Sequence, residues 1–372
     1  MNVMRVAILH DYLNQYGGAE RVLEALLELF PDADLYTLLY DKERTRGVFE
    51  GRVTRTSFLD IPLVRRHHRA FIPLMPLAAF CLRSRKPYDL IISSTAGYAK
   101  GFRVEGAYHV CYCLSPLRYA WETIYLEGIP FTPWPLRRAV LHPLALLFRA
   151  WDRQAATRPN VYTADSQFIA DKVKTYYGRD AEVIEPPVDT ALFHPETIPG
   201  SAEYYVMVGR LLYYKRFDIG IQAFNELQKP LKIVGMGPEF MKLKALVRSP
   251  NIEFIANASD DDLRLLYSNA KALIFPQVED FGLVAAEAQA CGTPVIAFGT
   301  GGAAEIVRDR TTGLLFAEQS VGGLVRAVRE FEGMKFDRHA IQKHGERFAV
   351  REFERRFIAM LESVGFSIPA RT

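Results

Sequence analysis

The chain has 372 residues, of which 49% are hydrophobic and 24% are charged, and its formal net charge is +3. This composition is that of a folded globular protein and excludes a disordered chain, while the small net charge argues against a general nucleic-acid binder. Because a single hydrophobic core usually stops growing at about 250–300 residues, we expect two domains.

Five short apolar runs in the first half of the chain have the length of buried strands. Amphipathic segments of helical length separate them, and this alternation is typical of βα units that build a parallel sheet. The clearest helix runs from Ala19 to Phe30, where apolar residues recur on one face until Pro31 ends the pattern. The expected strands are Arg5–Leu9, Leu35–Leu38, Leu90–Ser93, His109–Cys113 and Val161–Ala164.

Two consecutive prolines, Pro186 and Pro187, mark a seam near the middle of the chain, because they fix the backbone and exclude regular structure. We interpret this seam as an interdomain hinge. The alternation restarts after it and predicts a second α/β domain. Helices are expected to begin near Phe217, Glu239, Asp260, Val284 and Gly302, with a final charged helical stretch from Ala340. The expected strands are Tyr204–Val208, Lys232–Val234, Ile252–Ile255, Ala272–Phe275, Val295–Ala297 and Leu314–Phe316.

In doubly wound domains, ligands bind at the carboxyl ends of the parallel strands, so the loops after strands are where functional residues are expected. The first such loop contains Gly17 and Gly18, just before the first helix. Adjacent glycines at a helix N-terminus suit the close approach of a phosphate, although a tight turn is the alternative interpretation. The loop lacks the G-x-G-x-x-G pattern of dinucleotide-binding domains, which argues against an oxidoreductase.

A basic segment follows the first strand of the second domain and begins with Gly209 and Arg210. The planar guanidinium of Arg210 suits a diphosphate, and Lys215 adds a mobile positive charge. Two cations at the mouth of a crevice indicate that a strongly anionic ligand binds there. For Arg216, an ordinary surface charge remains the alternative.

The most specific pattern places two carboxylates, Glu279 and Glu287, on either side of an expected helix start. The amides of Phe281, Gly282 and Leu283 lie at that start, where backbone N–H groups have no partner within the helix and favour an anion. One carboxylate can then bind sugar hydroxyls and the other ribose hydroxyls, with a phosphate between them.

These segments resemble the retaining nucleotide-sugar transferases of glycosyltransferase family 4, which have the GT-B fold. The matching motifs follow the family's order along nearly the whole chain: Gly17-Gly18, Gly209-Arg210 with Lys215, Gly235-Met236-Gly237-Pro238-Glu239, Glu279 with Glu287, and Gly299-Thr300-Gly301-Gly302. The resemblance implies two Rossmann-like, doubly wound domains that face each other across a cleft. Residues 1–188 would bind the acceptor, residues 189–350 the nucleotide sugar, and a helix over 351–372 would cross back to the first domain.

The resemblance also implies roles for individual residues. Arg210 and Lys215 would hold the donor diphosphate, Glu279 and the amides of 281–283 the transferred sugar, and Glu287 the ribose. Arg210, Lys215 and Glu279 are the expected catalytic residues. The full set of expected donor-binding residues is Gly17, Gly18, Gly209, Arg210, Lys215, Gly237, Glu279, Phe281, Gly282, Leu283 and Glu287.

One position departs from the family pattern. Similar members carry a His after a Cys-Tyr-Cys run in the first domain, whereas Leu114 stands there in this chain. Either neighbouring residues replace that contact, or the activity is reduced or altered. His109 lies inside an expected strand, and we interpret it as structural. Ser115, Arg118 and Tyr119 are candidates for binding the sugar or the acceptor, with packing roles as the alternative.

The predicted function is retaining transfer of a hexose from a nucleotide sugar, with GDP-mannose favoured, to a glycan or lipid-linked acceptor in surface-polysaccharide assembly. A UDP-sugar donor is the alternative within the family. No D-x-D pair stands out as a magnesium site, so we expect neither a metal nor another cofactor. Two functions of other classes stay open, namely a sugar-nucleotide epimerase and a non-catalytic nucleotide-sugar-binding protein, and Leu114 gives the latter its best support.

Residues 52–103 are unusually basic for this chain, with ten Lys or Arg against two acids, and they surround the apolar run 71–80. Such a pattern suits peripheral contact with an anionic membrane. A core helix with a solvated basic rim is the alternative, since Pro73 and Pro76 interrupt an amphipathic helix.

The N-terminus has no signal-peptide pattern, and no run of about 18 uncharged apolar residues could span a bilayer. The four cysteines are too few and too scattered for a disulfide framework, so we expect reduced thiols and a cytoplasmic location. They are Cys81, Cys111, Cys113 and Cys291.

Overall fold

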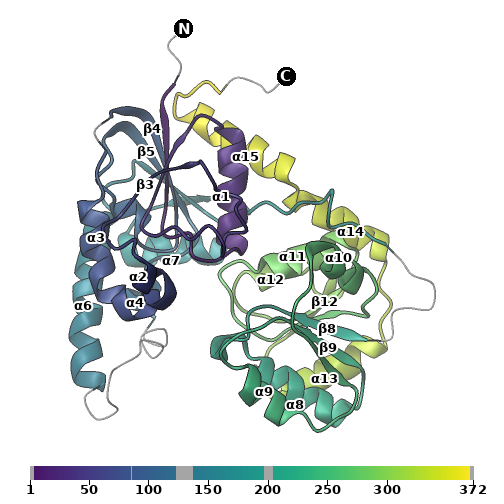
Figure 1. Ribbon diagram of the computed structural model, residues 1–372. Coiled ribbons are helices and arrows are strands. Elements are labelled where there is room, and N and C mark those ends of the chain that lie inside the picture. Colours follow the sequence, from purple (N-terminus) through teal and green to yellow (C-terminus); the bar gives the residue numbers. More distant parts are fainter. Residues whose placement is uncertain (1–3, 85, 123–136, 197–203, 369–372) are drawn as a thin grey trace. The chain divides into compact units, whose positions relative to one another are not determined.

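The computed structural model describes residues 4–84, 86–122, 137–196 and 204–368 (Figure 1). The chain divides into two compact units, 1–185 and 186–372. Each unit is built on one parallel β-sheet with helices between its strands, as expected for the α/β class. No helix in these described ranges is both long and apolar enough to cross a membrane.

The first unit contains a seven-stranded sheet with the strand order β3-β2-β1-β4-β5-β6-β7. The strands are β1 (Val6–His10), β2 (Asp34–Thr37), β3 (Val53–Thr56), β4 (Tyr88–Thr95), β5 (Gly106–Cys113), β6 (Val161–Ala164) and β7 (Ala181–Val183). The α-helices are α1 (Gly18–Leu29), α2 (Pro62–His67), α3 (Met75–Cys81), α4 (Arg118–Trp121), α6 (Arg137–Ala155) and α7 (Gln167–Tyr177), and the 3₁₀ helices are η1 (His68–Leu74) and η2 (Ala99–Gly101).

The second unit contains a six-stranded sheet with the strand order β10-β9-β8-β11-β12-β13. The strands are β8 (Tyr205–Val208), β9 (Leu231–Val234), β10 (Ile252–Ile255), β11 (Leu273–Phe275), β12 (Val295–Phe298) and β13 (Gly313–Phe316). The helices are η4 (Tyr213–Lys215), α8 (Phe217–Leu227), α9 (Phe240–Leu246), α10 (Asp260–Ser268), α11 (Leu283–Ala290), α12 (Ala303–Ile306), α13 (Val321–Glu332), α14 (Arg338–Gly345), η5 (Glu346–Phe348) and α15 (Val350–Ser363).

Several helices begin where a side chain caps their free backbone N–H groups. Ser166 caps α7 by accepting a hydrogen bond from the N–H of Ile169, and Gly178 ends that helix in the left-handed conformation. In the same way, Ser259 and Asp262 form a capping box at the start of α10. The central strands are buried over almost their whole length, because helices cover parallel sheets on both faces.

Sequence analysis missed both edge strands of the first sheet. β3 is partly exposed and largely polar, and β7 has only three residues. An edge strand needs no continuous apolar run because it is paired on one side only. The expected helical stretch from Ala340 is also broken: α14 ends at Gly345, and Ala349 is extended because it pairs with Val188. A pairing so distant in sequence leaves no local pattern.

In each sheet the strand order reverses at one place, between β1 and β4 in the first unit and between β8 and β11 in the second. At such a point the loops that follow the two neighbouring strands diverge and leave room for a ligand at the carboxyl edge. In the second sheet, the loop after β8 and the loop after β11 therefore border the same position at the carboxyl edge. These are the two loops that carry the basic segment and the first glutamate.

Candidate functional site

An ion pair joins the two loops at the switch point of the second sheet. Lys215, in η4 after β8, contacts the Glu279 carboxylate in the loop after β11. Only 16% of the Lys215 side chain and 18% of the Glu279 side chain are exposed. A half-buried pair of opposite charges interacts more strongly than a pair on the surface, because less water screens it. The structure thus brings together two of the three expected catalytic residues.

Two neighbouring side chains contact these loops. The Gln277 amide is buried and lies 3.4 Å from the Glu279 carboxylate. The Gln319 amide donates a hydrogen bond of 2.8 Å to the Pro276 carbonyl. Sequence analysis gave Gln277 no role, although its position two residues before Glu279 in an extended loop places both side chains on the same side.

Arg210 and Arg216 lie in different environments. Arg210 follows Gly209 directly, and its side chain is exposed at the carboxyl edge of β8. The Arg216 guanidinium instead forms an ion pair with Asp218, with nitrogen–oxygen distances of 3.1 and 3.2 Å. The structure therefore gives Arg216 a local partner within its own helix start.

In the glycine-rich loops after β9 and β12, the backbone packs directly against the backbone of the loops that form the site. A side chain at Gly237 would overlap the backbone of Leu211, and one at Gly302 would overlap the backbone of Phe281. The Gly302 N–H also donates a hydrogen bond of 2.9 Å to the Glu279 carbonyl. Only glycine allows this approach, so the loops after β9 and β12 fix the loops that carry the ion pair. Gly209 lies beside this pair, since a Cβ atom added there would be 3.6 Å from the Lys215 side chain.

Helix α11 begins where the sequence predicted an anion-binding helix end. Gly282 precedes its first residue, Leu283, and the Phe281 ring is buried against Phe348 at 5.6 Å between ring centroids. The first N–H groups of a helix have no partner within it, and the helix dipole is positive there. The Phe281 side chain thus belongs to the core, which leaves its backbone as the group that can face an anion.

Glu287 lies about one turn into α11 and is 95% buried, with 5% of its surface exposed. The Tyr267 hydroxyl on α10 donates a hydrogen bond of 3.2 Å to its carboxylate. Sequence analysis missed Tyr267, because nothing in a tyrosine at the end of an amphipathic helix indicates a partner on the next helix.

In the first unit, Gly17 is already paired within the protein. Its N–H donates a hydrogen bond of 2.9 Å to the Glu20 carboxylate, and Gly17 caps helix α1. Gly18 is the first residue of that helix. The Glu20 carboxylate therefore takes the amide that a phosphate would use, which favours the tight-turn interpretation over a phosphate site. A contact of Gly17 or Gly18 with the donor stays a prediction.

Asp11 organises the switch point of the first sheet. Its buried carboxylate follows β1 and accepts hydrogen bonds from the Thr95 hydroxyl and from the amides of Ala96, Tyr98 and Ala99, at 2.6–2.9 Å. The Thr95 carbonyl in turn accepts from the amides of Leu114 and Ser115 at 2.8 and 3.4 Å.

The acceptor candidates follow directly on this network. The side chain of Ser115 is fully buried, and its hydroxyl oxygen accepts a hydrogen bond of 3.4 Å from Arg118. Tyr119 packs against the core of the first unit. Leu114 is buried. His109 has the expected structural role, because its ring lies 3.0 Å from the Ser93 hydroxyl inside the sheet and burial lowers its pKa to about 3.

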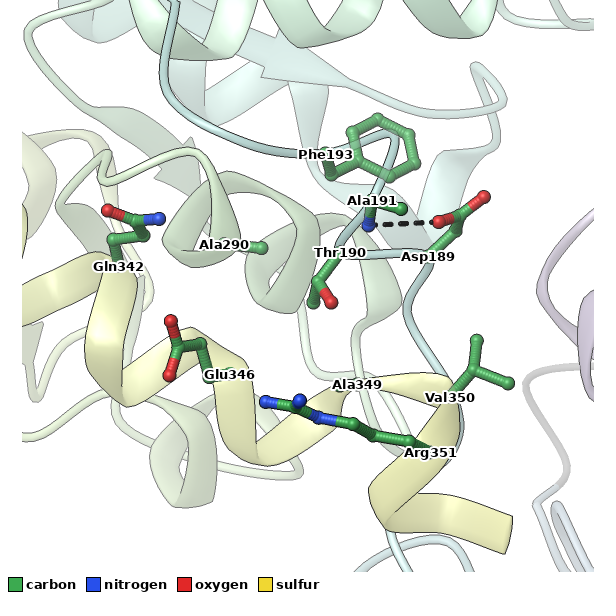
Figure 2. A pocket seen from close by; sticks show the side chains of 10 residues that line it. All are labelled: Asp189, Thr190, Ala191, Phe193, Ala290, Gln342, Glu346, Ala349, Val350 and Arg351. Atoms are coloured by element: carbon green, nitrogen blue, oxygen red, sulfur yellow. Dashed lines mark hydrogen bonds between the residues drawn. The ribbon is translucent and has the colours of Figure 1, made fainter.

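A pocket of about 340 Å³ lies elsewhere in the second unit, between the segment after the two prolines and the break that precedes α15 (Figure 2). Figure 2 shows the Asp189 carboxylate accepting a hydrogen bond of 3.0 Å from the amide of Ala191. None of the residues predicted from the sequence lines this pocket. Its lining residues are Asp189, Thr190, Ala191, Phe193, Ala290, Gln342, Glu346, Ala349, Val350 and Arg351.

The region that carries the ion pair matches a known protein family. Residues 189–348 match the model described as "Glycosyl transferases group 1". This segment, which is less than half of the chain, is similar to group 1 glycosyltransferase domains. It includes Lys215, Glu279 and Glu287 together with the glycine-rich loops that position them.

Curated relatives match a part of the chain. The D-inositol 3-phosphate glycosyltransferases of Mycobacterium tuberculosis and Mycobacterium bovis are 34% identical over an alignment of 182 residues, and the match covers 43% of this chain. The match spans 38% of the length of these relatives.

Solved structures resemble both units. HepE from Anabaena, in complex with UDP-glucose, has a TM-score of 0.67 at 18% identity, covering 97% of this chain and 100% of that one. A sucrose-phosphate synthase from Thermosynechococcus elongatus has a TM-score of 0.67 at 18% identity, covering 97% of this chain and 99% of that one. The likeness confirms the expected GT-B fold with two Rossmann-like domains.

Proposed function

We propose that the protein is a glycosyltransferase that moves a sugar from a nucleotide-sugar donor. The observation that carries the proposal is the ion pair between Lys215 and Glu279 at the switch point of the second sheet, inside the matched group 1 glycosyltransferase domain. A cation suited to a phosphate and a carboxylate suited to sugar hydroxyls lie side by side at the edge where such sheets bind ligands.

The donor would lie across the carboxyl edge of the second sheet. Arg210 and Lys215 would hold the diphosphate, and the amides at the start of α11 would face the same charge. Glu279 would bind hydroxyls of the transferred sugar, and Glu287 would bind the ribose. Gly209 and Gly237 would let the nucleotide approach the backbone after β8 and β9. The exposed position of Arg210 and the burial of Glu287 support this division between phosphate and ribose.

In the proposed reaction, the bond between the anomeric carbon of the sugar and the diphosphate oxygen breaks. The acceptor hydroxyl oxygen bonds to that carbon, and its proton passes to the departing phosphate oxygen. Because acceptor and leaving group share one face of the sugar, configuration is retained. Preorganised positive charge from Arg210, Lys215 and the helix start would stabilise the developing charge. We propose that this charge makes a metal ion unnecessary.

The donor we favour is GDP-mannose. The sequence Glu279-Asp280-Phe281-Gly282 and the run from Arg118 to Trp121 resemble members that use this donor in surface-polysaccharide assembly. A UDP-hexose is the second candidate. The Anabaena protein was solved with UDP-glucose, but at 18% identity that likeness concerns the fold and does not decide the donor.

The acceptor we propose is a glycan or a lipid-linked sugar, with Ser115, Arg118 and Tyr119 as candidate contacts. Their support is the Asp11 network, which fixes the loops from which this segment begins. A cytoplasmic location of the enzyme, at the face of the membrane where nucleotide sugars are available, belongs to the same proposal.

Incubation of the protein with a panel of nucleotide sugars tests the function. Slow release of free sugar and nucleoside diphosphate supports a transferase, because water replaces the acceptor. A new sugar isomer would identify an epimerase, and binding without turnover would identify a non-catalytic protein, the function that Leu114 allows. Calorimetric titration with GDP and with UDP then distinguishes the two donor classes.

A further inference from the structure

Helix α3 and the part of η1 after Arg69 are apolar on both of their faces. No charged residue occurs from Ala70 to Leu82. The inward side chains belong to the core of the first unit: Ile72, Met75, Ala78 and Ala79. The outward side chains Leu74, Leu77 and Phe80 recur at a spacing of three and are 44%, 53% and 41% exposed. A helix in water normally places polar residues on its outer face, so this outer face is suited to an apolar environment.

Two more exposed apolar side chains lie at the start of α2, the helix that packs against η1. Ile61 and Leu63 are 48% and 59% exposed, whereas the next residue in the sequence, Val64, is buried in the core. Among the described residues, Ile61, Leu63, Leu74, Leu77 and Phe80 are five of the twelve large hydrophobic side chains that are exposed. We call these five side chains the apolar surface. Their concentration in 20 consecutive positions separates them from hydrophobic residues scattered singly over a protein, which need no explanation.

Positive charge surrounds the apolar surface. Six Lys or Arg and no acid occur between Ile61 and Tyr88. Two of the cations are neutralised by acids from outside this segment: Arg65 pairs with Asp60 at 2.6 Å, and Lys86 pairs with Asp34 at 3.0 Å.

Three arginines beside the apolar surface keep their charge available. Within the described part of the chain, Arg66, Arg69 and Arg83 have no ion-pair partner. Arg83 and Arg103 instead lie over the Phe80 ring, at 5.7 and 3.5 Å from its centroid. Cations with long apolar stems next to exposed leucine and phenylalanine fit the boundary between lipid headgroups and acyl chains.

We propose that the apolar surface, with Arg66, Arg69 and Arg83 around it, docks on an anionic lipid bilayer. A second copy of this chain fits less well, because a symmetric interface would place the same basic rim against itself and like charges repel. A bilayer that contains anionic headgroups supplies both the apolar interior and the opposite charge. The inference stands without the proposed glycosyltransferase activity, since it rests only on the first unit.

Flotation of the full chain with lipid vesicles tests the proposal. Vesicles of phosphatidylcholine with about one third phosphatidylglycerol should bind the protein, and vesicles of phosphatidylcholine alone should bind much less. Raising sodium chloride from about 0.1 M to about 0.5 M should weaken binding severalfold. Binding that is equal on both vesicle types and unchanged by salt would overturn the electrostatic part, and no binding to either would overturn the proposal.

Two pairs of variants locate the surface. Leu77→Glu should abolish vesicle binding, while Met241→Glu, at an exposed hydrophobic residue of the second unit, should leave it unchanged. The double variant Arg66→Gln/Arg69→Gln should lose about fivefold per arginine, against no loss for Lys335→Gln/Lys343→Gln. Equal binding by all four would place the contact elsewhere. Self-association that Leu77→Glu abolishes, without vesicle binding by the unaltered chain, would identify a second copy as the occupant. Calorimetric titration with GDP and UDP reports on the proposed function separately.

Discussion

The Lys215 ammonium group contacts the Glu279 carboxylate across the switch point of the second sheet. Each charge is therefore the other's partner. A donor diphosphate would compete with Glu279 for the ammonium group, while a sugar hydroxyl would compete with Lys215 for the carboxylate. If these roles are correct, neutralising the Glu279 carboxylate should preserve or strengthen diphosphate binding. It should at the same time slow turnover.

The variant Glu279→Gln should bind a nucleoside diphosphate at least as tightly as the unaltered protein, because the ammonium group no longer has an anionic partner. Its transfer or donor hydrolysis should fall about 100-fold or more, since a group that stabilises the transferred sugar in the transition state is lost. Calorimetry with GDP and UDP measures the first quantity, and initial rates measure the second. Glu318→Gln, which removes an exposed ion pair with Arg326, is the matched control and should change neither. Weaker diphosphate binding by Glu279→Gln would contradict the assignment.

Substitution of Arg210 tests whether diphosphate binding needs two hydrogen bonds from its planar guanidinium group. Arg210→Lys keeps the charge but loses two-point hydrogen bonding, so the specificity constant should fall about tenfold, and Arg210→Ala should lose about 100-fold or more. Arg216→Lys is the control, because that guanidinium pairs with Asp218 within its own helix start. If Arg210→Lys and Arg216→Lys behaved alike in steady-state kinetics, Arg210 would have no special role at the phosphate.

The parallel sheets and the candidate donor loops were predictable because both depend on local patterns. Buried strands are apolar runs, and the residues around Glu279 and Glu287 lie in one short segment whose spacing is visible in the sequence. The sequence placed Lys215 and Glu279 in loops after strands, but it did not predict the ion pair between them, because the order of the strands in the sheet is not visible in the sequence. In contrast, Tyr267 and the pairing of Val188 with Ala349 depend on contacts between distant segments, which no local pattern records.

Glu287 and Tyr267 can be separated by their effects on donor binding. Glu287→Gln keeps the size of the side chain but weakens it as an acceptor for ribose hydroxyls, so the KM for the donor should rise about tenfold with a smaller change in kcat. Tyr267→Phe removes a single hydrogen bond and should cost about 1 kcal/mol of stability with little change in KM. Thermal unfolding and donor saturation curves measure the two effects. A KM unaffected by Glu287→Gln would remove this residue from the donor site.

The acceptor side was less predictable than the donor side. Asp11 follows a strand as a single acid with no accompanying motif, and its four donors come from a loop more than 80 positions away. Sequence analysis therefore named Ser115, Arg118 and Tyr119 but not the residue that fixes the loops before them. At Gly17 the sequence left two interpretations open, and the hydrogen bond from its N–H to the Glu20 carboxylate favours the tight turn, while a donor contact stays a prediction.

Two buried histidines should make the first unit less stable in mild acid. Burial lowers the pKa of His10 to about 4 and that of His109 to about 3, so the folded protein keeps both rings neutral. Their contribution is complete above about pH 6.5 and is lost as the pH falls toward the folded-state pKa, because the unfolded chain takes up protons first. Each histidine should cost about 2 kcal/mol at about pH 5.

Urea unfolding of His109→Gln at neutral and mildly acidic pH tests this expectation. The variant should lose about 2 kcal/mol less than the unaltered protein between about pH 7 and about pH 5, because glutamine does not titrate. His339→Gln, at an exposed position, should retain the full pH dependence. Parallel pH profiles for all three proteins would show that His109 is protonated in the folded state.

The Asp11 carboxylate is the structural counterpart, in the first unit, of the Lys215–Glu279 pair, since it too ties together the loops at a switch point. In Asp11→Asn, one carboxylate oxygen is replaced by an amide group that faces a backbone N–H, and a charged acceptor is lost. Stability should fall by about 2–4 kcal/mol, because a buried donor is left without a partner.

Nucleoside diphosphate binding, which depends on the second unit, should stay unchanged in Asp11→Asn, while any acceptor-dependent rate should fall. Asp89→Asn is the matched control, because its carboxylate accepts one exposed hydrogen bond of 2.8 Å from the amide of Arg5. Urea unfolding and calorimetry with GDP and UDP give the two readouts. If Asp11→Asn were as stable as Asp89→Asn, the four hydrogen bonds would not fix the loop after β4. The acceptor candidates would then lose the observation that supports them.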